Sequence, residues 1–124
     1  MIIFDAHADT PTRLLDENKS LFKNDLHIDL KRLLKNECMQ VFATFISPEY
    51  KNNAMERVNS VVANFLKEAE KNEFAICKTH RDIEIAKGPC GILSLETILP
   101  RTLMRPSRSM AAQWMSSVAL SWTA

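Results

Sequence analysis

Residues 1–9 read MIIFDAHAD, an apolar run that ends in a histidine and an aspartate two positions apart. Thr10 and Pro11 follow at once, and because proline lacks a backbone donor, the run predicts a strand that ends here. Side chains two residues apart in a strand point to the same face. His7 and Asp9 can therefore hold one metal ion together, and zinc accepts both ligand types. The alternative for the same pair is that they face water or cap the following turn.

The chain up to residue 96 alternates between strand-like and helix-like segments. Apolar runs bounded by proline or glycine indicate strands, helical spacing of apolar residues indicates helices, and Thr79 with Asp82 has the pattern of a capping box. We expect strands at 39–47, 74–77 and 91–96 and helices at 26–34, 53–71 and 79–87. This alternation places the chain in the α/β class.

Four pieces of this stretch resemble, in the same order, the membrane (renal) dipeptidases, which are zinc metallopeptidases of the amidohydrolase group. The pieces are FDAHADT at 4–10, IDLKRL at 28–33, QVFATF at 40–45 and ILSLE at 92–96. The resemblance covers residues 1–96 and implies a (β/α)8 TIM barrel with two zinc ions at the C-terminal ends of its strands. It also implies that His7 and Asp9 bind the first zinc, that Glu96 bridges both ions, and that the substrate is a dipeptide.

The chemistry of these residue types agrees with the resemblance. Ligands at the ends of different parallel strands converge on the catalytic face of a barrel. Two metal ions about 3.5–4 Å apart can hold a hydroxide and polarise a peptide carbonyl. For Glu96 the alternative is a solvated acid at a strand end. His27 and His80 lie in helical contexts and match no ligand position, so we expect both at the surface.

Length limits how much of such a barrel the chain can form. A (β/α)8 barrel needs about 250 residues, and the chain has 124. We therefore expect a truncated N-terminal portion of about three to four βα units. No histidine follows Glu96, whereas the family takes two further histidine ligands and its contacts to the substrate carboxylate from later strands. We expect an inactive fragment, with a non-enzymatic remnant or part of an amidohydrolase acting on a non-peptide amide as alternatives.

The segment 97–124 differs in character from the rest. All fifteen acidic residues of the chain lie at or before Glu96, and Thr97 stands where the family usually has glycine. Two interpretations stay open for this segment. It is either translated out of frame, or it is a divergent loop and helix that leads to a fourth strand at 117–122.

Composition and the N-terminal residues indicate a cytoplasmic protein. The net charge of +1 implies neither nucleic acid nor an anionic membrane as a partner. The first residues lack the basic and long apolar regions of a signal peptide, and no apolar run approaches the ~20 residues that span a bilayer. The three cysteines, Cys38, Cys77 and Cys90, form no Cys-x-x-Cys pair, so we expect reduced, partly buried thiols. A partial barrel has an open strand edge, which predicts self-association or aggregation.

Overall fold

The computed structural model describes residues 3–97, which form a mixed α/β structure around a small parallel sheet. The strands are β1 (Ile3–Ala8), β2 (Cys38–Ile46) and β3 (Cys90–Thr97), with β2 in the middle of the sheet. The helices are α1 (Thr10–Asp16), α2 (Leu30–Leu33), α3 (Ala54–Lys71) and α4 (His80–Ala86), with 3-10 turns η1 (Leu34–Asn36) and η2 (Pro48–Tyr50). This confirms the α/β class, and β2, β3, α3 and α4 lie within about a residue of their predicted bounds. Expectations for residues 98–124, including a strand at 117–122, lie outside the described residues.

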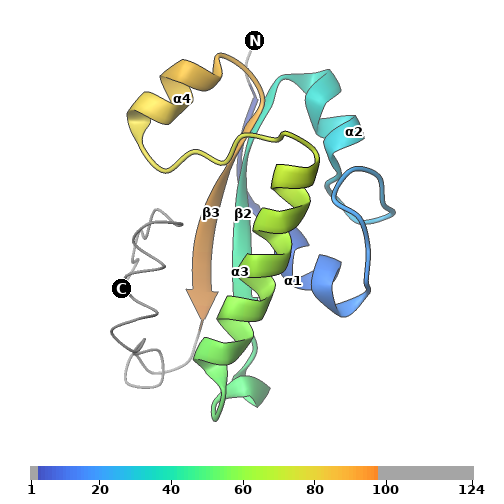
Figure 1. Cartoon of the computed structure of the whole chain (residues 1–124), viewed down its shortest axis with the longest axis vertical. Coiled ribbons are helices and arrows are strands. Elements are labelled where there is room, and N and C mark those ends of the chain that lie inside the picture. Colours follow the sequence, from blue (N-terminus) through green and yellow to red (C-terminus); the bar gives the residue numbers. More distant parts are fainter. Residues whose placement is uncertain (1–2, 98–124) are drawn as a thin grey trace.

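The core lies between the sheet and its helices. Helix α3 runs along the sheet (Figure 1) and buries its apolar face, including Val58 and Phe65. Phe42 of β2 meets this face, with its ring centroid 4.8 Å from that of Phe65. Ile46 of β2 and Leu93 of β3 belong to the same buried cluster. Because alternate strand residues point to opposite sides, the even-numbered residues of β2 define the core face of the sheet.

The sequence did not predict helix α1, which begins directly after β1. Pro11 ends the strand as expected, but it occupies the first turn of a helix, where a missing backbone donor costs nothing. Leu14, 1% exposed, anchors the helix in the core. Only Asp9 therefore lies between β1 and α1, and the two elements hold it and the C-terminal end of β1 in place.

Two predicted elements are shorter than expected. Of the helix predicted at 26–34 only Leu30–Leu33 is α-helical, because Asp29 is extended and its carboxylate caps α2 at the Arg32 amide, 2.9 Å away. The predicted strand at 74–77 is reduced to a single bridge between Ile76 and Gly91. By contrast, the capping box of Thr79 and Asp82 at the start of α4 is present in full. No helix in the described part of the chain is long and apolar enough to cross a membrane.

Candidate metal centre

The three predicted ligands come together at one edge of the sheet. His7 is the second-last residue of β1, Asp9 follows that strand, and Glu96 is the second-last residue of β3. Because the strands are parallel, both C-terminal ends lie at the same edge, on either side of β2. The Nε2 atom of His7 lies 3.2 Å from Oδ1 of Asp9 and 3.5 Å from Oε2 of Glu96. One ligand atom from each residue lies within 4.8 Å of the other two.

Strand register places Glu96 on the face opposite the core. Glu96 pairs with Phe45, and the next residue, Thr97, pairs with Ile46. Ile46 belongs to the buried core cluster, so Phe45 and Glu96 point to the other side of the sheet. The Glu96 side chain is 53% exposed, which leaves its carboxylate open to solvent and to a bound ion.

An irregularity in β1 turns His7 toward the same place. Asp5 pairs with Gln40, but Ala8 pairs with Phe42, so β1 takes three steps where β2 takes two. In an unbroken register His7 would lie opposite Phe42 and share the core face. The extra residue gives that position to Ala8, which is buried, and leaves His7 free to meet Glu96. A bulge of this kind commonly redirects a side chain next to a functional site.

Asp9 occupies the N-cap position of α1 without acting as a cap. Aspartate is a favoured N-cap residue because its carboxylate accepts a backbone hydrogen bond in the first turn. Here the Asp9 side chain makes no such bond. Its Oδ1 lies instead against the imidazole of His7. The alternative that Asp9 caps the following turn is therefore wrong.

The two separations measured from His7 are close to those of a zinc site, and the three ligand atoms lie within 4.8 Å of one another. Zinc bonds of about 2.0–2.2 Å in tetrahedral geometry put neighbouring ligand atoms roughly 3.3–3.6 Å apart. The 3.2 Å and 3.5 Å separations from His7 are close to that range before any ion draws the ligands together. One nitrogen and two carboxylate oxygens match catalytic zinc sites, which keep a fourth position open.

The other histidines stay outside this cluster, as predicted. A cavity of about 310 Å³ lies beside the cluster, lined by His7 and Asp9 and also by Arg13 and His27. His27 is exposed at this cavity, and His80 on α4 is 84% exposed. The sequence interpretation did not identify Arg13 as a residue that lines this cavity. Arg13 forms an ion pair with Glu17, and their i,i+4 spacing could have indicated this pair on a helix. Within residues 3–97 there is no other group of three potential metal ligands.

The cysteines take no part in the site, and all three are free and buried as expected. Burial raises the pKa of the Cys77 thiol to about 12, and a hydrogen bond with Cys90 adds to that shift. Burial, with the nearby Asp5 carboxylate, also raises the pKa of Cys38. Because thiolate is the form that binds metals, the raised pKa values make Cys38 and Cys77 poor ligands at neutral pH.

Comparison with known proteins assigns neither a family nor a function to the chain. No protein-family model and no curated protein matches the chain. The resemblance to membrane dipeptidases therefore stays a prediction from the four sequence pieces quoted above.

Proposed function

We propose that this chain carries the first metal ligands of a zinc-dependent hydrolase of the membrane dipeptidase type, and that residues 3–97 form the first units of its (β/α)8 barrel. One observation carries the proposal: His7, Asp9 and Glu96 converge at the C-terminal edge of a parallel sheet. That edge is where barrel enzymes place their catalytic groups.

The sheet supports the barrel part of the proposal. The strands are neighbours in chain order, β1-β2-β3, and every pairing is parallel. Helix α1 follows β1, and helix α3 follows β2 and packs against it. A barrel is built by continuing this repeat until the last strand meets the first. Within residues 3–97, β1 forms one edge of the sheet, and a closing strand would pair there.

The chain's own groups have distinct parts in the proposed reaction. The imidazole of His7 and a carboxylate oxygen of Asp9 would hold one zinc ion, which when bound polarises a carbonyl and lowers the pKa of bound water. Glu96 directs Oε2 toward His7. As a bridging ligand, Glu96 would offer its second carboxylate oxygen to another ion. The half-exposed side chains leave the dipeptide a direct approach from solvent.

A metal-binding chain without turnover is the second candidate. It is favoured because the cluster offers ligands for one ion, while His27 and His80 lie outside it. The sequence has no further histidine. The resemblance to membrane dipeptidases implies two further histidine ligands, and no histidine follows Glu96.

Zinc titration tests the site. We expect weak binding of one equivalent, and a loss of about tenfold or more in affinity for His7→Ala, Asp9→Asn and Glu96→Gln, because each removes a direct ligand. His80→Ala is the matched control, since it removes an exposed imidazole that lies outside the cluster and is 3.8 Å from the Glu84 carboxylate. If the three ligand variants bind zinc as the parent does, the assignment is wrong.

A dipeptidase assay on the same zinc-loaded protein separates the two candidates. We expect the 124-residue chain to bind zinc without measurable hydrolysis of dipeptides. Metal-dependent turnover that is lost in His7→Ala and kept in His80→Ala would establish the peptidase and refute the expectation of inactivity.

A further inference from the structure

We propose that Asp5 is a positioning residue for the metal centre: its carboxylate holds the bulge that turns His7 toward Glu96. The inference rests on the proposed zinc site and adds to it a residue that is not a ligand. His7 reaches Glu96 only because the register of β1 shifts between Asp5 and Ala8. Whatever stabilises that shift also sets the position of the His7 imidazole.

Asp5 makes the hydrogen bond that closes the bulge. Its Oδ1 accepts the backbone N–H of His7 at 3.0 Å. A bulge disrupts the regular ladder of backbone hydrogen bonds, so an irregular amide needs another acceptor. An aspartate that bonds the amide two residues ahead is a common local way to supply one. Asp5 therefore fixes the backbone of the residue whose side chain binds the ion.

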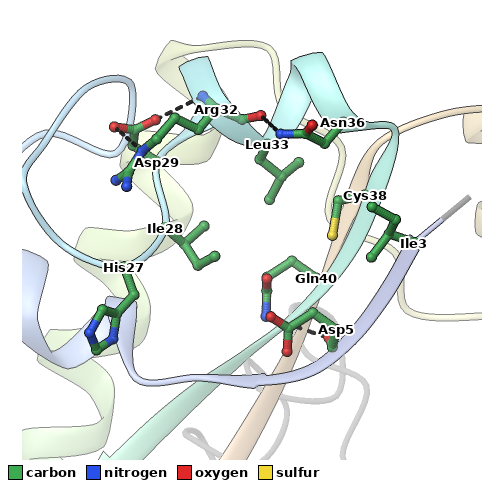
Figure 2. Close-up of a pocket in the computed structure, with 10 residues that line it drawn as sticks. All are labelled: Ile3, Asp5, His27, Ile28, Asp29, Arg32, Leu33, Asn36, Cys38 and Gln40. Carbon is green, nitrogen blue, oxygen red and sulfur yellow. Dashed lines mark hydrogen bonds and ion pairs between the residues drawn. The ribbon is translucent and has the colours of Figure 1, made fainter.

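Asp5 cannot serve as a ligand itself, because its side chain belongs to the other face of the strand. It pairs with Gln40, two residues before Phe42 on the core side of β2. There it lines a separate cavity of about 260 Å³ together with Ile3 and Cys38 (Figure 2). Its effect on the metal must then pass through the backbone of His7.

Gln40 holds the bulge from the neighbouring strand. Its side chain is fully buried, and Nε2 donates to the Val41 carbonyl at 3.0 Å and, at the long distance of 3.5 Å, to the Asp5 carbonyl. Figure 2 shows the two side chains next to each other at the wall of the cavity. Two hydrogen bonds thus hold this part of β1. The Asp5 carbonyl, just before the bulge, accepts from Gln40, and the His7 amide inside the bulge donates to the Asp5 carboxylate.

Two substitutions at the same position distinguish positioning from charge. Asp5→Ala removes the acceptor and the negative charge, whereas Asp5→Asn removes the charge and keeps an oxygen that can accept from His7. We expect zinc affinity to fall roughly 10- to 100-fold in Asp5→Ala, as for other groups that orient a ligand. Asp5→Asn should stay close to the parent. Equal losses in both variants would show that Asp5 acts through its charge and overturn the proposal.

A measurement on the zinc-free protein keeps this test independent of the metal site. Hydrogen exchange of the His7 amide should be faster in Asp5→Ala than in the parent and in Asp5→Asn, because only Asp5→Ala loses the acceptor. Thermal unfolding of each variant shows whether the fold is retained. If the parent does not bind zinc, the proposed function fails, and the exchange rates still decide the role of Asp5. Unchanged exchange in a folded Asp5→Ala variant refutes it.

Discussion

Replacing Gly91 by alanine should destabilise the protein, because core side chains pack closely against β3 at this residue. A Cβ placed on Gly91 would lie 2.8 Å from Cδ1 of Ile76, 2.9 Å from Cε1 of Phe74 and 3.1 Å from Cε2 of Phe42. Carbon atoms normally pack about 3.5–4.0 Å apart. Three neighbours must therefore move at once to admit one methyl group.

The size of the effect depends on which neighbours can yield. The end of the Ile76 side chain can rotate away, but Phe42 is fully buried and packs against the Phe65 ring at 4.8 Å between centroids, with the two rings tilted by 46°. Phe74 contacts Phe42 edge-on at 6.2 Å, so neither ring can move alone. Inserting a methylene into a packed core costs about 1–3 kcal/mol. The reduced chain entropy of the unfolded state offsets about 0.4–1 kcal/mol of this cost. Near the middle of both ranges the net loss is roughly 1–2 kcal/mol.

Denaturant and thermal unfolding, followed by circular dichroism, measure this loss. A net 1–2 kcal/mol corresponds to a fall in Tm of about 3–10 °C for a chain of this size. Gly88→Ala is the matched control, because its Cβ would meet only the Ala86 carbonyl oxygen at 3.8 Å and no glycine has positive φ. We expect this control to be neutral or slightly stabilising. If Gly91→Ala is as stable as Gly88→Ala, the packing of residues 74–76 against β3 is wrong.

Two further changes test the helix caps. Burial raises the pKa of Asp29, but hydrogen bonds from Arg32 and Asn24 outweigh it and hold the pKa below its ordinary value. The ionised Asp29 carboxylate therefore stabilises the folded state above the unfolded pKa of about 4. The difference in unfolding free energy between the parent and Asp29→Asn, measured with urea, should shrink as the pH falls through the folded pKa of Asp29. A difference that does not change with pH would contradict this. Thr79→Ala removes the capping box of α4 and should lower the stability of this helix by about 1 kcal/mol. Because α4 buries no residue, we expect the loss as faster hydrogen exchange in residues 80–86. Unchanged exchange there would refute the role of the cap.

The strands that carry the site were predictable, because buried parallel strands are continuous apolar runs of limited length. Runs of that kind placed His7 and Glu96 at strand ends, and the structure brings their side chains within 3.5 Å. Helix α1 was missed because Pro11 is read equally well as the end of a strand or as the first turn of a helix. The N-terminal half of the 26–34 helix was wrong because Asp29 uses its carboxylate to start a helix rather than continue one. Such competition between local hydrogen bonds is not resolved by apolar spacing.

The bulge in β1 could not be read from the sequence, and it changes what the pattern of the first strand means. Ile3, Asp5, His7 and Asp9 are all odd-numbered, so a regular strand would put all four side chains on one face. The structure divides them: Ile3 and Asp5 line one cavity, whereas His7 and Asp9 line another and meet Glu96. Where the division falls depends on Ala8, the small residue opposite Phe42. Packing against β2, which lies more than thirty residues further along the chain, determines which side chains of β1 lie on each face. The pair His7 and Asp9 was therefore predictable from local spacing, while their meeting with Glu96 depends on a register that only the assembled sheet defines.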